Sequence, residues 1–404
     1  MISVEEALAR LLAPLETLMP EQISIAEGIG RVLAEDVAAR RTQPPFAVSA
    51  MDGYAVRADD LGSIPAVLRI VAEIPAGAGF GGRLGPGEAA RIFTGAPLPE
   101  GADTIIIQED AERSGDRVEL REGAPRGRYV RRAGLDFAEG DVLLQAGRRL
   151  TPRDIGLAAA MNRPWLFVYR RPRVAILSTG DEIVMPGDPI GPHQIVSSNA
   201  LALAAFVTAC GGVPVLVGNA PDDPDALRRI AAAAKGVDLF VTTGGVSVGE
   251  HDLVRGVLSE DGLAIDFWEI AMRPGKPLMV GRYRGTPMLG LPGNPVSTLV
   301  CSLLFLKPAI DRLSGVPEVA EPPATARLAV ALRQNDRRQD YLRARLVHAA
   351  DGVLEAVPFD VQDSSMMRPL AAADCLVMRP PHAPPLAAGS TVPIVRFPGG
   401  AWPL

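Results

Sequence analysis

The chain has 404 residues, of which 48% are hydrophobic and 22% are charged, and its formal net charge is -6. This length and composition predict a globular protein of two to four domains. The negative charge argues against nucleic acid as a partner, because proteins that bind the phosphate backbone are usually basic. Neither a signal peptide nor an apolar run of membrane-spanning length is recognisable, so we expect a cytoplasmic protein without a membrane partner.

The N-terminal part of the chain predicts mainly helices. Ser3 and Glu6 fit a capping box that begins a helix over residues 3–18, in which apolar residues recur at helical spacing. A helix-like piece is expected around residues 29–33, and a further helix is expected over residues 152–161. Between them, residues 44–136 are rich in Gly and Pro and contain short β-like runs, which predict a small inserted β-rich domain.

Strand-like and helix-like segments then alternate, which predicts a doubly wound, mostly parallel α/β sheet. The expected strands are residues 174–177, 213–217, 239–242, 277–280 and 287–289. The expected helices are residues 198–210, 223–234, 252–259 and 296–313. Pro-rich turns and short strands follow, and they predict an all-β C-terminal domain. The expected domains are an N-terminal linker and helical domain (1–43 plus 137–170), an inserted β-rich domain (44–136), an α/β domain (171–315) and an all-β domain (316–404).

Three glycine-bearing loops in the α/β segment each follow a short apolar run. They are residues 243–250, 273–276 and 291–295. Ligands of doubly wound sheets bind in the crevice at the carboxyl ends of the strands, where such loops meet. The loops carry Thr, Ser, Asp, Lys and Asn but no catalytic Cys or His pair, which suits a phosphorylated, metal-bridged ligand.

Each loop also has a simpler structural interpretation. The hydroxyls and amides of residues 178–182 can cradle phosphate, but so short a pattern is also typical of a polar turn. Asp252 can ligate magnesium through water or act only as a helix N-cap. Arg273 and Lys276 can bind an anion or lie on a solvated turn. In the insertion, Asp52 before Gly53 is a turn residue by default.

Six motifs in order resemble the molybdopterin molybdenumtransferase family (the MoeA type, which is also the carboxy-terminal half of gephyrin). They span nearly the whole chain and are residues 49–55, 91–97, 178–182, 243–250, 274–277 and 291–295. The resemblance implies an elongated homodimer of multidomain subunits with a β-barrel-like C-terminal domain. It also implies an active site between the α/β domain of one subunit and the β-rich insertion of the other.

The implied reaction joins molybdate to adenylylated molybdopterin with Mg²⁺-dependent hydrolysis of the adenylate, which releases AMP and molybdenum cofactor. Molybdopterin adenylyltransferase and downstream molybdoenzyme maturation proteins are the implied partners. The implied catalytic residues are Asp52, Thr94, Asp136, Glu182 and Asp252, with Glu182 and Asp252 as metal ligands. The implied substrate-binding residues are Ser178, Thr179, Gly180, Asp222, Thr243, Gly244, Gly245, Ser247, Arg273, Lys276, Pro292, Gly293, Asn294, Pro295, Arg343 and Ser364.

Three residues depart from the family pattern. Glu269 stands where relatives often carry a base, Arg273 replaces a frequent lysine, and Asp363 stands beside Ser364 where glycine is common. These departures leave the choice between molybdate and tungstate open. Two other functions are compatible with the motifs. One is the related adenylyltransferase, against which the flanking domains argue, and the other is a non-catalytic molybdopterin-binding scaffold.

Overall fold

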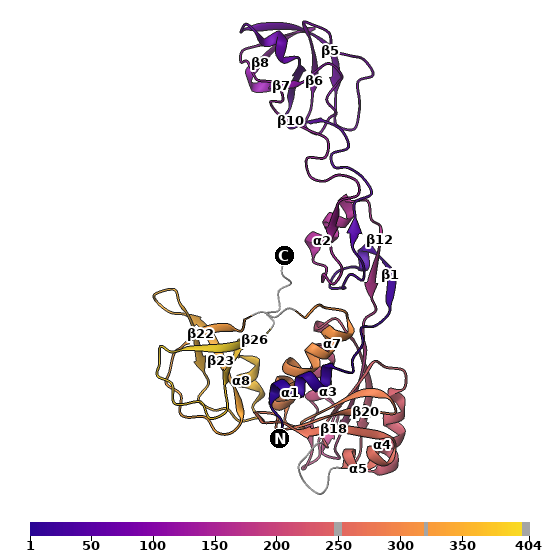
Figure 1. The fold of residues 1–404 in the computed structure, drawn as a ribbon, viewed down its shortest axis with the longest axis vertical. Coiled ribbons are helices and arrows are strands. Elements are labelled where there is room, and N and C mark those ends of the chain that lie inside the picture. Colours follow the sequence, from indigo (N-terminus) through magenta and orange to yellow (C-terminus); the bar gives the residue numbers. More distant parts are fainter. Residues whose placement is uncertain (246–252, 319–321, 398–404) are drawn as a thin grey trace.

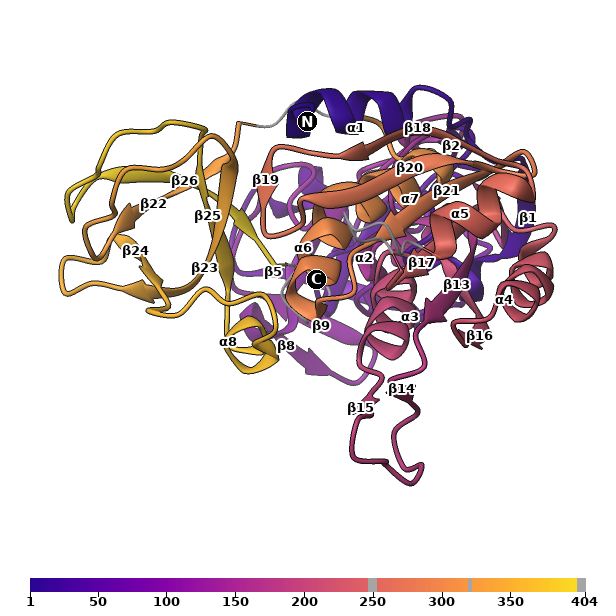
Figure 2. The ribbon, with the colours of Figure 1, turned by 90° about the horizontal axis from the view of Figure 1, so that it is seen from below.

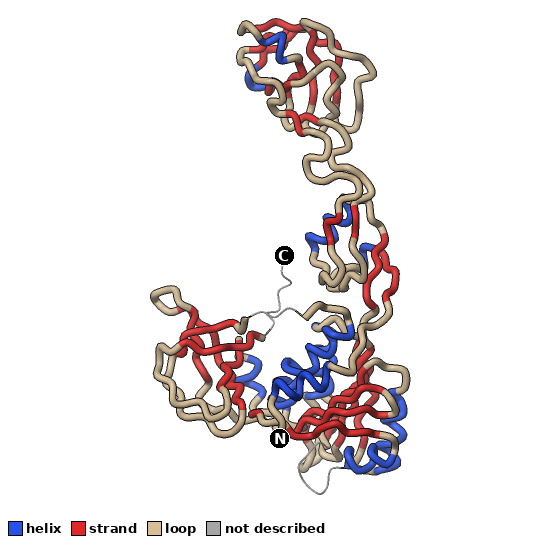
Figure 3. The backbone as a smooth tube through the Cα atoms, viewed as in Figure 1, coloured by secondary structure: helices blue, strands red, loops and turns tan. Residues whose placement is uncertain are grey.

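The computed structural model describes residues 1–245, 253–318 and 322–397. The chain is elongated, with the β-rich insertion at one end, a small domain in the middle, and the α/β and C-terminal domains side by side at the other end (Figure 1). The connection between the insertion and the middle domain consists of loops (Figure 3). No helix of the described residues is long and apolar enough to cross a membrane.

The middle domain is formed by two distant chain segments. Strand β1 (Pro20–Ser24) pairs antiparallel with β12 (Trp165–Tyr169), and β2 (Val37–Ala38) pairs with β11 (Val142–Leu144). Helix α2 (Pro152–Ala160) covers them and starts with a complete capping box at Thr151 and Asp154. The chain therefore leaves the middle domain toward the insertion, and returns from it, through neighbouring strands.

The expected helix around residues 29–33 is wrong. A single 3₁₀ turn occupies Ile25–Glu27, and Gly30 then adopts a φ of +71° that no helix allows. Val32 and Leu33 are buried and form bridges to Arg149 and Val168. Their burial among strand residues overrides the local helical spacing.

The insertion contains a six-stranded sheet with the order β7-β4-β6-β5-β9-β8. Its strands are β4 (Gly53–Val56), β5 (Ala66–Ile74), β6 (Glu88–Ile92), β7 (Thr104–Ile107), β8 (Ala111–Ser114) and β9 (Arg117–Leu120). A short ribbon of β3 (Val48–Ser49) and β10 (Val130–Arg131) lies at the base of this domain, next to the connecting loops (Figure 1).

The α/β domain has a six-stranded sheet with the order β16-β13-β17-β21-β20-β18. Its strands are β13 (Arg173–Thr179), β16 (Val213–Ala220), β17 (Leu239–Thr243), β18 (Leu263–Glu269), β20 (Pro277–Tyr283) and β21 (Thr286–Leu291). The first four strands of that order are parallel. Strand β20 then pairs antiparallel with β21, and β18 pairs antiparallel with β20. The helices are α3 (Asn199–Ala209), α4 (Pro224–Ala231), α5 (Leu253–Glu260), α6 (Pro295–Cys301) and α7 (Lys307–Leu313).

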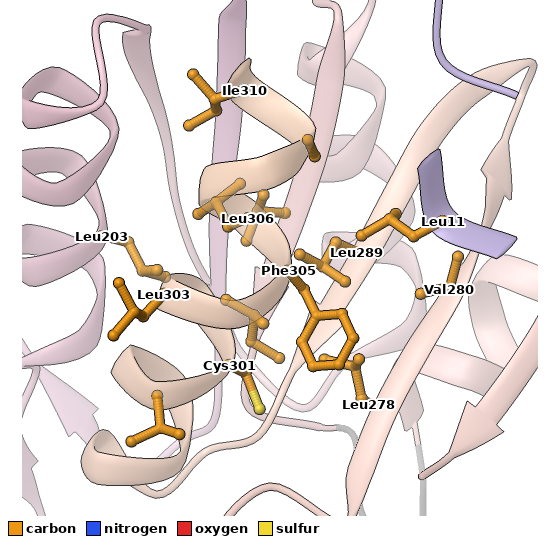
Figure 4. Close-up of a cluster of buried hydrophobic side chains, with 14 of the residues drawn as sticks. Leu11, Leu203, Leu278, Val280, Leu289, Cys301, Leu303, Phe305, Leu306 and Ile310 are labelled. Atoms are coloured by element: carbon orange, nitrogen blue, oxygen red, sulfur yellow. The ribbon is translucent and has the colours of Figure 1, made fainter. Parts of the chain in front are cut away.

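The last two helices are joined by a π-helical turn over Ser302–Leu306. Pro308 is the physical reason, because it lacks the N–H that an α-helix needs and its ring displaces the preceding turn. The sequence predicted one continuous helix here. Phe305 and Leu306 of this turn point onto the sheet side chains Leu278 and Leu289, and together they form the centre of the core (Figure 4).

Helix α1 (Val4–Leu12) packs on the α/β domain, where Ala7 and Leu11 join the same buried cluster. The sequence predicts that residues 1–43 form one domain with residues 137–170, whereas in the structure α1 packs against the core of the α/β domain. The helix starts as predicted, because the Ser3 hydroxyl accepts a hydrogen bond from the Glu6 amide at 3.0 Å. It ends earlier than predicted because Pro14 follows.

The C-terminal domain is a closed barrel in which β23 pairs with both β24 and β25. Its strands are β22 (Ala324–Leu328), β23 (Gln339–His348), β24 (Leu354–Pro358), β25 (Cys375–Arg379) and β26 (Thr391–Arg396), with helix α8 (Met367–Ala371) beside them. Strand β19 (Met272–Arg273), which precedes β20 of the α/β domain, adds to this barrel by pairing with β23. The two domains are thereby joined by backbone hydrogen bonding.

Candidate active site

The carboxyl ends of β13, β17 and β21 meet at one edge of the α/β sheet. Ser178 lies opposite Thr243, and Thr243 lies opposite Leu291, so three loops leave the sheet at neighbouring points. A cavity of about 650 Å³ opens at this edge. Nine of the predicted substrate-binding residues line it: Ser178, Thr179, Thr243, Gly244, Gly245, Pro292, Gly293, Asn294 and Pro295.

Two hydroxyl groups of residues in the cavity wall have no hydrogen-bond partner among the described residues. They are Ser178 Oγ and Thr179 Oγ1, and both atoms are buried. A buried hydroxyl without a partner costs about 1–3 kcal/mol, so native proteins rarely leave one without a reason. The cavity that both residues line offers such a reason, because a ligand oxygen there can complete their hydrogen bonds.

Glycines bring the first two loops into contact. Gly244 and Gly245 have φ values of +86° and +62°, which side-chain-bearing residues rarely adopt. A Cβ atom on Gly244 would lie 2.7 Å from the Thr179 carbonyl oxygen, and one on Gly245 would lie 2.3 Å from Val254 Cγ2. The loop after β17 can therefore reach the loop after β13 only without side chains at these two positions.

The carboxylate of Glu182 lies against the loop after β13. It lines the cavity, and a Cβ on Gly180 would be only 2.4 Å from its Oε2 atom. Strand β14 (Ile183–Val184) follows directly and pairs with β15 (Ile195–Val196) at the base of a projecting loop (Figure 2). Asp222 is exposed, and its backbone amide donates to Asp181 Oδ1 at 2.9 Å, so it lies beside the cavity rather than in its wall.

The third loop is held rigidly by hydroxyl groups below it. Thr298 Oγ1 donates to the Pro292 carbonyl at 2.6 Å, and Thr243 Oγ1 donates to the same oxygen at 3.2 Å. Above it, the Asn294 amide donates to Ser364 Oγ of the C-terminal domain at 3.0 Å. Ser364 thus touches the loop, whereas Ser365 lines the cavity.

The two predicted basic residues carry carboxylate partners. Lys276 Nζ lies 3.3 Å from Glu269 Oε1, and Arg273 pairs with Asp340 and, at 3.4 Å, with Asp336. The hydrogen bond that Arg273 donates to the Asp340 carboxylate raises the pKa of the Arg273 guanidinium. Neither cation is part of the cavity wall, although Pro277 next to Lys276 is. Their predicted role in anion binding stays a prediction.

Arg343 is buried beneath the loop that carries Ser364. Its exposed fraction is 1%, and it donates to Gln362 Oε1 and to the Met366 carbonyl, both at 3.2 Å. Burial lowers the pKa of this guanidinium, and the nearby Asp363 carboxylate opposes that shift. Asp363 itself accepts hydrogen bonds from the Ser365 backbone and hydroxyl, so it stabilises the turn in which glycine was expected.

The predicted catalytic residues of the insertion lie far from this cavity. Asp52 Oδ1 accepts hydrogen bonds from the Thr94 backbone at 2.7 Å and from the Thr94 hydroxyl at 2.8 Å. These bonds, the backbone one first, lower the pKa of Asp52. Asp136 lines a second cavity of about 810 Å³ together with Arg41 and Arg131. Within one chain, the insertion and the α/β domain lie at opposite ends (Figure 1).

Two predicted residues, Ser247 and Asp252, lie outside the described residues. Within the described part of the chain, no group of three His, Cys, Asp or Glu residues is arranged to hold a metal ion. Several cavity residues were not predicted as site residues, among them Asn199, Ile195, Val196 and Met367. An Asn at a helix start usually suggests capping, and the others come from distant segments without a recognisable motif.

Comparison with known families gives consecutive matches along the chain. Residues 2–162 match the MoeA N-terminal region (domain I and II), residues 175–312 match the probable molybdopterin binding domain, and residues 325–397 match the MoeA C-terminal region (domain IV). These matches define a multidomain protein built around a molybdopterin-binding type of α/β domain.

Similar proteins extend over nearly the full length. A molybdopterin molybdenumtransferase of a Nostoc species is 39% identical, with 91% of this chain and 87% of the relative covered. Molybdopterin molybdenumtransferase 2 of Mycobacterium tuberculosis is 36% identical, with 98% and 99% covered. The crystal structure of a molybdopterin biosynthesis MoeA protein from Pyrococcus horikosii superposes with a TM-score of 0.84 at 33% identity, over 99% of this chain and 100% of that one. The chain belongs to the molybdopterin molybdenumtransferase family.

Proposed function

We propose that this chain inserts molybdate into adenylylated molybdopterin, hydrolyses the adenylate with Mg²⁺, and releases AMP and molybdenum cofactor. The observation that carries the proposal is the cavity at the sheet edge, where the buried Ser178 and Thr179 hydroxyls have no partner in the described part of the chain and lie beside a glycine loop. Full-length relatives that bear the name of this activity support the choice of substrate.

The cavity residues suit an oxygen-rich ligand. The Ser178 and Thr179 hydroxyls can donate to phosphate or oxyanion oxygens, and the bare backbone at Gly244 and Gly245 lets such a group approach the loop closely. Lys276 lies next to the cavity wall and can receive an oxyanion when its ion pair with Glu269 opens. Binding and orientation of the phosphate are therefore the tasks of the α/β domain.

The donors at the cavity fit Mg²⁺ in the manner typical of phosphate enzymes. This ion usually binds through one or two carboxylates and substrate phosphates while it keeps several waters. Glu182 is a carboxylate of the described cavity wall, and Asp252 is the predicted second ligand. When bound, the ion would neutralise phosphate charge during P–O cleavage.

We further propose a cytoplasmic homodimer. The insertion that carries Asp52, Thr94 and Asp136 lies at the opposite end of the chain from the α/β domain, so a second copy would supply these residues to the cavity (Figure 1). The Thr94 hydrogen bonds keep Asp52 ionised, which suits a group that orients water or holds a metal-bound ligand. A molybdopterin adenylyltransferase would deliver the substrate, and molybdoenzyme maturation proteins would receive the product.

A defined assay tests the proposal. Purified protein is mixed with adenylylated molybdopterin, Mg²⁺ and molybdate, and both AMP release and activation of an apo-molybdoenzyme are followed, with tungstate in a parallel reaction. We expect molybdate-dependent AMP release together with activation. Binding of the pterin without AMP release, even at excess molybdate, would refute catalysis and leave a scaffold. ATP consumption with molybdopterin would instead identify an adenylyltransferase.

A further inference from the structure

Asn199, the first residue of α3, lies between two of the cavity loops. Its side-chain amide donates to the Thr243 hydroxyl at 2.9 Å and to the Gly293 carbonyl at 2.8 Å. Thr243 ends β17, and Gly293 belongs to the loop after β21, so one amide group connects loops from two different strands. Both distances are those of well-formed hydrogen bonds.

These contacts differ from the ordinary role of an asparagine at a helix start. Such a residue usually accepts a hydrogen bond from the backbone of its own helix. Here Ser198 occupies the N-cap position of α3, and no side-chain capping bond is formed there. The Asn199 amide instead donates away from its helix, toward the cavity loops that it lines.

The hydrogen bonds of Asn199 belong to a chain that reaches the C-terminal domain. Thr243 Oγ1 in turn donates to the Pro292 carbonyl at 3.2 Å. Two residues after Pro292, the Asn294 side-chain amide donates to Ser364 Oγ at 3.0 Å. Thr243 is buried, so loss of the Asn199 amide removes a hydrogen-bond partner from a hydroxyl that water cannot easily reach.

We infer that Asn199 is a positioning residue that fixes the separation of the Thr243 loop and the Pro292–Pro295 loop. The β17–β21 pairing ends at Thr243 and Leu291, and beyond it Gly244, Gly245 and Gly293 have no side chains with which to pack, so side-chain hydrogen bonds help to set the distance between these loops. Displacement of a binding group by 1 Å can cost about 100-fold in rate. The inference rests on the proposed function for the identity of the substrate.

Asn199→Ala and Asn199→Asp test the inference, and Asn335→Ala is the matched control. Asn335 is a buried asparagine of the C-terminal barrel whose amide donates to three backbone carbonyls, at 2.8, 3.1 and 2.8 Å. Its removal also deletes amide hydrogen bonds, but it leaves the cavity loops unchanged. Asn199→Asp keeps the size of the side chain and loses both donors.

Two measurements are made on the full chain. The first is the KM for adenylylated molybdopterin and the kcat of AMP release. The second is hydrogen exchange of peptides that cover residues 239–245 and 289–298 in the free protein. For both Asn199 variants we expect a KM raised about tenfold or more, as expected when loops that hold a ligand are misplaced, and faster exchange in both peptides. The control should lose stability without either change.

The outcomes separate this inference from the proposed function. Unchanged exchange in either peptide, or an unchanged KM in an active protein, would overturn the positioning role. Equal changes in the control would overturn it as well, because they would indicate general destabilisation. If the wild-type protein releases no AMP, the proposed function fails, and the exchange of the two peptides alone decides whether Asn199 couples the loops.

Discussion

The hydroxyl of Thr179 should weaken the folded protein while it strengthens ligand binding. Thr179 Oγ1 is buried and has no partner among the described residues, which costs about 1–3 kcal/mol of folding free energy. Thr179→Val keeps the shape of the side chain and removes this penalty. We therefore expect the free variant to be as stable as the wild type or more stable, and its activity to fall.

Thr242→Val is the matched control. Thr242 Oγ1, near the end of neighbouring strand β17, is also buried and has no partner within residues 1–245, 253–318 and 322–397, but this residue is not part of the cavity wall. Both substitutions should leave the melting temperature unchanged or raise it, by roughly 2–4 °C for each kcal/mol gained in a domain of this size. Only Thr179→Val should lower kcat/KM, by about tenfold for a lost hydrogen bond to a charged ligand.

Thermal unfolding and AMP release, measured on the same preparations, check this prediction. If Thr179→Val lowers the melting temperature, the hydroxyl has a structural partner and the argument from its burial is refuted. If both variants lose activity equally, the effect does not come from contact with the ligand. If Thr179→Val retains full kcat/KM, the hydroxyl does not bind the substrate.

Three further predictions follow from the same geometry. Glu269→Gln should lower the KM for molybdate, because it frees Lys276 from an ion pair of 3.3 Å; an unchanged or raised KM would exclude Lys276 as an oxyanion contact. Thr94→Val removes one of the two bonds that lower the pKa of Asp52, so the acidic limb of the pH profile should move to higher pH, and an unmoved limb would contradict a role for the ionised carboxylate. In a homodimer with shared sites, mixing inactive Asp52→Asn and Glu182→Gln subunits should restore about a quarter of the wild-type activity, since half of the dimers regain one site; no recovery after subunit exchange would refute the shared site.

The pH prediction has a defined sign. The pKa of Asp52 is lower in the folded protein than in the unfolded chain because the folded protein donates hydrogen bonds to the carboxylate. The stability that these bonds contribute is present above the unfolded pKa and is lost as the pH falls through the folded pKa. We therefore expect the contribution of Asp52 to the free energy of unfolding to be lost only in this acidic range, and we expect this loss to be smaller in Thr94→Val than in the wild type.

The sequence predicts the sheet edge of the site well because its signals are local. An apolar run followed by glycine marks the end of a buried strand, and parallel strands place such ends together. The observed register of Ser178, Thr243 and Leu291 confirms this expectation. The mostly parallel α/β sheet is also confirmed, as is the β-barrel-like C-terminal domain that the family resemblance implied.

Short sequence patterns could not predict contacts between segments that lie far apart in the chain. Glu269 stands where the family pattern often has a base, and the pairing of β18 with β20 places it opposite Pro277 and beside Lys276, with which it forms an ion pair. Asn199 carries no motif, because its partners lie 44 and 94 residues away. Helix α1 looked like part of the N-terminal domain because sequence proximity says nothing about which core receives Ala7.

The elongated shape explains why the predicted catalytic residues fall into two groups, one in the insertion and one at the edge of the α/β sheet. The middle domain has its own core, in which β1 and β12 pair over five residues, and the insertion is attached to it through the loops next to β2 and β11. In this structure the whole middle domain lies between the insertion and the α/β sheet of the same chain (Figure 1). Under the proposed homodimer, chemistry that needs both Asp52 and Glu182 involves two copies of the chain, whereas binding at the sheet edge involves only one. A monomeric variant should accordingly retain affinity for the pterin substrate while it loses AMP release.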